Sequence, residues 1–279
     1  MSLSSAEIRA ILEKLGKMPR KHLGQSFLQS LPTIERIINL CDLESDDVVL
    51  EIGPGLGALT FTIAAQVKQV QAIEIDPAFI QFLRDKSNSL SIDNIDIVAG
   101  DALTLEYPLI INKIISAVPY SISGPLTFKI LEYMKVQPAI AFLIYQKEFG
   151  EKILAKPGTI AYSRISASVA LFADVLSLLE ISRNNFYPVP RVDSILLRIN
   201  PRSRIDMSIA DVCMDLLRGL FPFKNKLLKK ALIMYLKNEG SILSSNDLEN
   251  MPFGDMRVRD LDRDEFLNLA QWYSTVTGG

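Results

Sequence analysis

The chain has few of the residues that build disulfide frameworks, metal centres and histidine-based active sites. It contains two cysteines, Cys41 and Cys213, far apart and outside any Cys-x-x-Cys pair, and one histidine, His22. We therefore expect no disulfide, no metal site and a cytoplasmic location. Because His22 lies in a basic stretch, we expect it to be a solvated surface residue.

Long apolar runs and an excess of positive charge are also missing. No run approaches the ~20 residues that a membrane-spanning helix needs, so no membrane partner is expected. The N-terminal stretch lacks the apolar segment of a secretory signal. The formal net charge is -2 and the pI is about 5.6, which disfavours general affinity for nucleic acid. Any RNA contact must come from local clusters of Lys and Arg.

Short apolar strands alternate with helices from residue 47 onwards, which is the pattern of βαβ units in a parallel sheet. The strands are predicted at 47–53, 69–76, 95–101 and 113–120, and two late strands at 174–181 and 192–200 are predicted to form a hairpin. After residue 202 the pattern changes to amphipathic helices with no strand between them. We expect an α/β domain over residues 1–201, with helices on both faces of its sheet, and a small all-helical domain over 202–279.

A glycine-rich turn and two acids follow the first three predicted strands. Gly53 and Gly55 come first, Glu74 ends the next strand 21 positions after Gly53 (74 − 53), and Asp101 follows the third. Ligands bind at the carboxyl ends of such strands, where an acid at this distance accepts from ribose hydroxyls. Each feature alone fits a tight turn or a solvated strand end, but together they predict a cradle for an adenosine-bearing ligand. A pyrophosphate is not required, because residues 51–67 contain no Lys or Arg and Pro54 lacks an N–H.

The fourth strand end carries an aromatic ring, in the stretch "IISAVPYSISG". Tyr120 is predicted to lie over the neighbouring crevice, where a flat ring can stack on a base. Phe186, in a Pro-stiffened turn, is a candidate for a second ring, although a core position is equally compatible with its sequence context.

Eight motifs in order resemble the KsgA-like rRNA adenine N6-dimethyltransferases, most closely over residues 20–200 and more loosely beyond. They are "KHLGQSFL", "VVLEIGPGLGALT", "AIEIDP", "GDAL", "VPYSISGPLTFKIL", "QKEF", "AKPGTIAYSRIS" and "FYPVPRVDS". The resemblance implies a Rossmann-like class I methyltransferase domain, a helical domain that binds RNA or the ribosome, and S-adenosylmethionine as the methyl donor. It implies dimethylation of two adjacent adenosines near the 3′ end of small-subunit rRNA, within a 30S-type particle during ribosome biogenesis. We expect the protein to be a monomer.

The same resemblance implies roles for individual residues. On the donor side it implies contacts from Gln25, Ser26, Leu28, Gly53, Gly55, Glu74, Asp101, Ala102 and Ala117. On the base side it implies that Tyr120 and Phe186 stack on a flipped adenine beside Ala117, Val118 and Pro119.

Two positions depart from the family pattern. Ser26 stands where the family usually has Asn, and we expect little effect because both side chains are small and polar. The family motif Asn-Leu-Pro-Tyr reads Ala117-Val118-Pro119-Tyr120 here, so the side-chain acceptor beside the reacting amine is missing.

Three readings of the function follow. The first is a working dimethyltransferase with a weakened site, and the second is a ribosome-assembly factor of the same fold with little turnover. The third, a nicotinamide-dependent oxidoreductase, is disfavoured because the single histidine leaves no candidate proton relay. We favour the first because the other motifs of the donor and base pockets are present. Contacts to RNA are predicted for Lys21, Arg191, Lys224, Lys226, Lys229 and Lys230, although a solvated helix face is the ordinary interpretation of such clusters.

Overall fold

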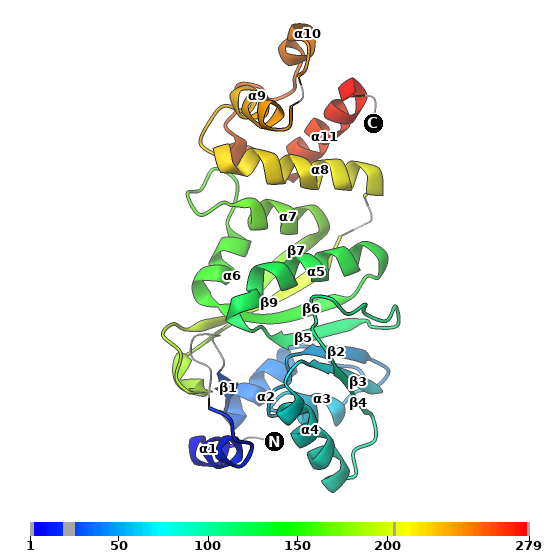
Figure 1. The fold of residues 1–279 in the computed structure, drawn as a ribbon, viewed down its shortest axis with the longest axis vertical. Helices are drawn as coiled ribbons and strands as arrows, with labels where there is room; N and C mark the ends of the chain where they lie inside the picture. The colour runs from blue at the N-terminus through cyan, green and yellow to red at the C-terminus, as the bar shows by residue number, and fades with distance from the viewer. Residues whose placement is uncertain (1–2, 19–25, 203–204, 241, 278–279) are drawn as a thin grey trace. The chain divides into compact units, whose positions relative to one another are not determined.

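The computed structural model describes residues 3–18, 26–202, 205–240 and 242–277, and Figure 1 shows its ribbon. Lys21, His22 and Gln25 therefore lie outside the described residues. The chain divides into two compact units. The first holds residues 1–150 and 175–201, and the second holds residues 151–174 and 202–279.

The first unit is built on a seven-stranded sheet in the order β4-β3-β2-β5-β6-β9-β7. Five neighbouring strands run parallel: β2 (Val48–Ile52), β3 (Gln69–Glu74), β4 (Ile95–Ala99), β5 (Lys113–Ala117) and β6 (Ile140–Gln146). Strand β9 (Ser194–Pro201) pairs antiparallel with β6, and β7 (Ala173–Ile181) lies beside β9 at the edge. The predicted α/β sheet is confirmed, and the two late strands are neighbours as expected.

Both faces of the sheet are covered. Successive strand residues point to opposite faces, and in β2 and β5 both members of a consecutive pair, Val49 with Leu50 and Ile114 with Ile115, are fully buried. This burial explains why the central strands read as continuous apolar runs rather than alternating ones. The helices of this unit are α1 (Ser5–Lys14), α2 (Leu31–Leu40), α3 (Thr60–Ala64), α4 (Pro77–Ser89) and α5 (Ser123–Val136).

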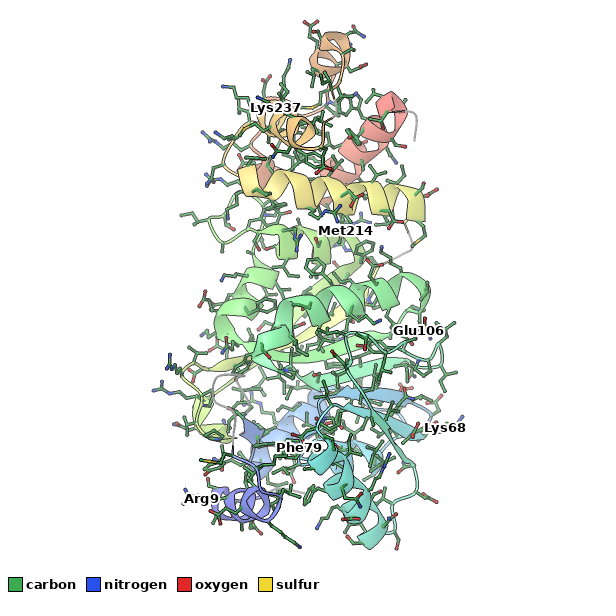
Figure 2. The ribbon with its side chains drawn as sticks, viewed as in Figure 1. Arg9, Lys68, Phe79, Glu106, Met214 and Lys237 are labelled. Atoms are coloured by element: carbon green, nitrogen blue, oxygen red, sulfur yellow. The ribbon has the colours of Figure 1, made fainter. Side chains whose placement is uncertain are left out.

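Helix α1 packs on a short ribbon of two strands that the sequence did not predict. In this ribbon β1 (Phe27–Leu28) pairs antiparallel with β8 (Phe186–Tyr187). The apolar face of α1 packs Ile8 and Leu12 against Phe27. On the same helix Arg9, labelled in Figure 2, donates from Nε to the Tyr187 hydroxyl at 3.1 Å. The ribbon thus joins two segments that lie far apart in the sequence, one at residue 27 and the other at residue 187.

The second unit is helical. It contains α7 (Arg164–Phe172), α8 (Met207–Leu220), α9 (Leu228–Asn238), α10 (Ser245–Glu249) and α11 (Arg263–Thr277), while α6 (Lys147–Leu154) and β7 cross the division between the units. The sequence-based boundary at residue 202 differs from this division by residues 151–174. Helix α7, which the sequence did not predict, packs against α8 and α11. The buried Tyr162 also donates its hydroxyl to the carbonyl of Leu261 at 3.2 Å.

Candidate functional site

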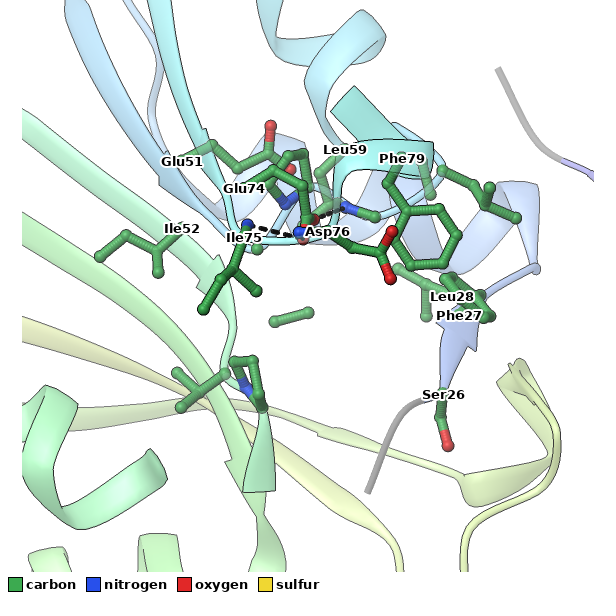
Figure 3. Close-up of a pocket in the computed structure, with 18 of the residues that line it drawn as sticks. Ser26, Phe27, Leu28, Glu51, Ile52, Leu59, Glu74, Ile75, Asp76 and Phe79 are labelled. Atoms are coloured by element: carbon green, nitrogen blue, oxygen red, sulfur yellow. Dashed lines mark hydrogen bonds between the residues drawn. The ribbon is translucent and has the colours of Figure 1, made fainter. Parts of the chain in front are cut away.

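A cavity of about 360 Å³ lies where β2, β3, β4 and β5 end, as Figure 3 shows. Its described lining includes Ser26, which precedes β1, Leu28 from β1, and the turns that follow each of the four strands. Every described residue that was predicted to contact the donor or the base lines this one cavity. Open α/β sheets place ligand sites at this edge, so the topology agrees with a binding site here.

The glycine turn after β2 forms the wall of the cavity. Gly53 and Gly55 have φ angles of +71° and +58°, a region that L side chains rarely adopt. A Cβ added to Gly55 would meet the Phe27 ring at 3.2 Å. Gly55 also donates its N–H to Oε2 of Glu74 at 3.0 Å. Contacts with Phe27 and Glu74 therefore hold the turn in place, and its glycines expose the backbone to the cavity.

Glu74 ends β3 with both carboxylate oxygens engaged. Oε2 accepts from Gly55, and Oε1 accepts from the N–H groups of Ile75 and Asp76, each at 2.9 Å. Burial raises the pKa of Glu74, although these three bonds oppose that rise. A carboxylate has about four acceptor positions, so one remains for a ligand hydroxyl. This geometry is compatible with the predicted ribose contact.

Glu51 is a second buried carboxyl at the cavity, and the sequence analysis missed it. Its side chain is 2% exposed, and its Oε2 has no hydrogen-bond partner among the described residues. Burial raises the pKa of Glu51 to about 8. The signal in the sequence was an acid inside the apolar strand "VVLEI", where a charge is costly to bury unless something pairs with it.

Asp101 and Ala102 form the wall after β4. Oδ1 of Asp101 accepts from the N–H of Leu103 at 2.9 Å, which holds the carboxylate in place at the start of a turn. The carbonyl of Ala102 accepts from the buried Tyr107 hydroxyl at 2.8 Å. Both residues line the cavity, as predicted for an adenine-binding edge.

The corner after β5 carries Ala117, Val118, Pro119 and Tyr120. Val118 donates its N–H to the carbonyl of Ile144 at 3.1 Å, which ties the corner to β6. Tyr120 opens the short helix η2 (Tyr120–Ile122) and shares a 3.3 Å hydrogen bond between its hydroxyl and that of Ser194. Ser194 is fully buried on β9 and was also missed by sequence reasoning. The side chain of Ala117 adds no polar group to this corner.

Phe186 lies in the core and also borders the cavity. It is 3% exposed, packs in the main apolar cluster of the first unit and faces Leu28 across the β1–β8 ribbon. It also lines the cavity. Its ring is therefore a fixed part of the wall, and the proposed stacking on a base stays a prediction.

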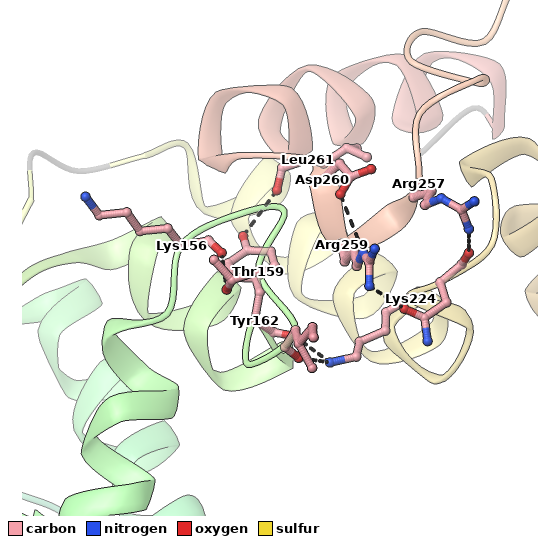
Figure 4. A network of polar contacts seen from close by, with 10 residues as sticks. Lys156, Thr159, Tyr162, Lys224, Arg257, Arg259, Asp260 and Leu261 are labelled. Atoms are coloured by element: carbon pink, nitrogen blue, oxygen red, sulfur yellow. Dashed lines mark hydrogen bonds and ion pairs between the residues drawn. The ribbon is translucent and has the colours of Figure 1, made fainter.

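The basic residues predicted to contact RNA differ in how free they are. Lys224 donates from Nζ to the carbonyls of Ile160 and Tyr162 at 2.9 and 2.8 Å, so it holds a loop within the second unit (Figure 4). Lys226, Lys230 and Arg191 are exposed, and Lys229 is half-buried. The exposed side chains are available for a partner, whereas Lys224 already has internal acceptors.

Two negative results apply to the described residues only. No helix in the described part of the chain is long and apolar enough to cross a membrane. Within the same residues, no group of three or more His, Cys, Asp or Glu side chains is arranged to hold a metal ion.

The sheet order, its antiparallel strand β9 and the acid-lined cavity define a Rossmann-like class I methyltransferase. Residues 16–275 match the ribosomal RNA adenine dimethylase family, and the chain belongs to that family. The match extends through both compact units.

Relatives and solved structures agree with this assignment. The chain is 37% identical over its full length to a probable ribosomal RNA small subunit methyltransferase A from Methanothermobacter thermautotrophicus, covering 99% of that protein. It is 38% identical, over 83% of each chain, to the protein of the same name from Methanopyrus kandleri. A dimethyladenosine transferase from Plasmodium falciparum superposes with a TM-score of 0.79 at 28% identity, over 90% of this chain and 98% of the other. The 23S rRNA methyltransferase ErmE gives 0.65 at 26% identity, over 88% and 98%.

Proposed function

We propose that this protein transfers methyl groups from S-adenosylmethionine to N6 of two adjacent adenosines near the 3′ end of small-subunit rRNA, dimethylating each. The substrate would be a 30S-type particle during ribosome maturation in the cytoplasm. The observation that carries the proposal is the single cavity that joins Gly55, Glu74 and Asp101 to the Tyr120 corner. Relatives that match over the whole chain are named for methylation of small-subunit rRNA.

The donor half of the cavity fits S-adenosylmethionine. The remaining acceptor position on Glu74 suits ribose hydroxyls, Asp101 suits the adenine amino group, and the bare Gly53–Gly55 backbone admits the methionine part. The orphaned Glu51 carboxyl suits a cationic end of a ligand. When bound, the donor supplies a sulfonium methyl that is already activated, so the protein needs neither a metal nor a strong base.

The base half of the cavity holds and polarises the adenine. The Tyr120 ring gives a stacking surface at the end of β5, and Phe186 closes the wall nearby. Adenine N6 is a weak nucleophile because its lone pair is delocalised into the ring. A backbone carbonyl at Val118 can accept one amino hydrogen, but Ala117 offers no second acceptor. We expect this loss to slow transfer by roughly 10²–10³, by analogy with the removal of a preorganised donor elsewhere.

A second candidate function is favoured by one observation, namely Ala117. A protein with an intact donor cavity and a weakened methylation corner can act as an assembly factor that binds immature particles with little turnover. The two candidates differ in chemistry and share the binding surfaces.

Incorporation of labelled methyl groups into undermethylated 30S-type particles separates the two candidates. Transfer to the two adjacent adenosines supports the dimethyltransferase. Binding to the particle without incorporation, under conditions in which S-adenosylmethionine binds, supports the assembly factor. Transfer to a different rRNA position would contradict both.

Ala117→Asn should raise the rate of methyl transfer, by as much as roughly 10²-fold, because it restores a side-chain acceptor at the reacting amine. The measurement is single-turnover incorporation at saturating donor. Ala10→Asn, at an exposed position of α1, is the matched control and should leave the rate unchanged. A rate for Ala117→Asn no higher than that of the starting protein would show that the missing amide is not the limiting feature.

A further inference from the structure

The cavity wall carries charge of one sign. Four acidic side chains line it (Glu51, Glu74, Asp76 and Asp101), and no Lys, Arg or His is among the described lining residues. One of these acids is neutralised from outside the cavity, because Nζ of Lys17 lies 2.7 Å from Oδ2 of Asp76. The remaining wall favours a ligand that brings positive charge with it.

The two buried glutamates of this wall differ in their hydrogen bonds. Glu74 has three backbone N–H groups on its two oxygens, which suits a carboxylate. Oε2 of Glu51 has no hydrogen-bond partner among the described residues, although the side chain is 2% exposed. A buried carboxyl with one oxygen left unpartnered favours its neutral form unless a cation pairs with it.

Glu51 lies on the same face of the sheet as the methylation corner. In the parallel register Glu51 is paired with Ile115, and Ala117 follows two residues later on the same face of β5. The departure from the family motif at Ala117 removes a polar group there. Glu51 shares this face with Glu74, but Glu51 is the one of these two buried carboxyls that lines the cavity with an oxygen lacking a partner among the described residues, which leaves it for the amino-acid end of a donor.

We propose that Glu51 gives up its proton to solvent when S-adenosylmethionine binds, and that the resulting carboxylate pairs with the ammonium group of the donor's amino-acid end. One proton then leaves the protein for each donor molecule bound. The proposal rests on the proposed function, because it takes S-adenosylmethionine as the ligand of this cavity.

The surroundings of Glu51 set the direction of the effect. Burial is the main cause that raises its pKa to about 8, the Thr60 hydroxyl on α3 lowers it, and the charge of Glu74 on β3 raises it further. The other titratable groups at the wall are Asp76 after β3, Asp101 after β4 and Tyr120 after β5. No described cation faces Glu51, since Lys113 on β5 pairs with Asp47 at 2.8 Å, and Asp47 precedes the other end of β2.

Because the pKa of Glu51 is raised in the free protein, donor binding should be linked to the release of a proton. Below about pH 7 the free protein holds the proton on Glu51, and donor binding must expel it, so release is close to one proton. As the pH rises through about 8, the free protein loses this proton beforehand and the release falls towards zero. Donor affinity should therefore rise with pH up to about 8, above which the donor's own amine begins to deprotonate.

The test is titration calorimetry with the full chain at about pH 7, in buffers of different ionisation enthalpy, which reports the protons released per ligand. S-adenosylmethionine and S-adenosylhomocysteine both carry the ammonium and should release about one proton. Methylthioadenosine lacks the amino-acid end and should release none. Glu51→Gln should abolish the release and weaken S-adenosylmethionine by about tenfold, while leaving methylthioadenosine affinity nearly unchanged.

Glu106→Gln is the control variant, because Glu106 is exposed and does not line the cavity (Figure 2). If S-adenosylmethionine binds without releasing a proton, or if Glu51→Gln releases as many as the starting protein, the inference is wrong and the proposed function stands. If S-adenosylmethionine does not bind, the donor in the proposed function is wrong as well. Should Glu51→Gln fail to fold, the pH profile and the methylthioadenosine comparison still decide.

Discussion

At the residue scale, the hydroxyl pair of Tyr120 and Ser194 has the clearest consequence for catalysis. Ser194 is fully buried, and its described hydrogen bond is the one to Tyr120 at 3.3 Å. This bond joins the corner after β5 to strand β9 and limits how the Tyr120 ring can tilt. Under the proposed function, Ser194 is a positioning residue that presents the ring to the base.

Ser194→Ala should lower the rate of methyl transfer by about 2- to 10-fold, the worth of one ordinary hydrogen bond. Donor affinity should not change, because Ser194 is not part of the donor half of the cavity. Tyr120→Phe removes the same bond and keeps the ring, so the double variant should be no slower than either single one.

Ser87→Ala is the matched control for this pair, since Ser87 is also buried and its hydroxyl donates to the carbonyl of Ile92 at 2.7 Å, away from the cavity. It should cost stability without slowing transfer. Additive losses in the Tyr120 and Ser194 variants would show that the two hydroxyls act separately.

Residues at the carboxyl ends of the parallel strands could be predicted from the sequence, and buried polar residues elsewhere in the strands could not. Glu74, Asp101 and Tyr120 were found because each follows an apolar run, and parallel strands bring such ends to one edge. Glu51 and Ser194 sit within buried stretches, where the sequence shows a polar residue but not what it faces. Finding them required the register between strands.

At the element scale, the glycine turn between β2 and α3 combines a backbone requirement with a packing requirement. Gly57 has φ +80°, and a Cβ there would lie 2.4 Å from Cε2 of Phe61 and 3.0 Å from Cδ2 of Leu83. Phe61 and Leu83 are buried in one apolar cluster of the first unit, so neither ring nor methyl group can move freely. The turn therefore anchors the cavity wall to the core.

Gly57→Ala should destabilise the protein by roughly 2–4 kcal/mol, combining the cost of a left-handed Ala with that of overpacking. Gly240→Ala has the same backbone requirement, at φ +70°, with nothing within 4 Å of its Cβ, and should cost only about 1 kcal/mol. Chemical denaturation of both variants measures the difference. Equal losses would mean that packing around Gly57 contributes nothing.

The strands of the parallel sheet could be predicted from the sequence. The two-residue strands and a helix that is buried on most of its surface could not. Strands β2 to β5 are five or six residues long and rich in Val, Ile, Leu and Ala, with turn residues after them, so their places were clear. Strands β1 and β8 have two residues each, which is too few for any periodic pattern. Helix α7 has buried residues almost all round, so no polar face marked it as a surface helix.

At the scale of the whole molecule, the second unit is assembled from two separate stretches of chain, and contacts rather than chain order define it. Residues 151–174 join it through α7 and the loop that Lys224 holds. The sequence showed the change of character at residue 202, but it could not show that an earlier segment returns to the same unit. The exposed Lys226 and Lys230 remain available on this unit for the proposed rRNA contact.

Lys226→Glu combined with Lys230→Glu should weaken binding to immature 30S-type particles and reduce its salt dependence by about one unit of slope per lysine. Donor affinity should stay the same, because neither lysine lines the cavity. Filter binding over a range of salt concentrations measures the slope.

The charge-matched control for these lysines combines Lys68→Glu with Lys237→Glu, at two exposed positions labelled in Figure 2. This control should retain both affinity and slope. The same loss in both double variants would indicate a general charge effect instead of a contact at Lys226 and Lys230.

The acidic lining of the cavity also affects the exchange of cofactor between successive methyl transfers. Under the proposed function, dimethylation of two adenosines needs repeated exchange of spent cofactor for fresh, and each transfer removes the sulfonium charge of S-adenosylmethionine. An acidic wall with no Lys, Arg or His among its described lining residues would attract the fresh, more positive molecule and hold the spent one less firmly. The wall that draws the methyl carrier in thus also favours its departure once it is used.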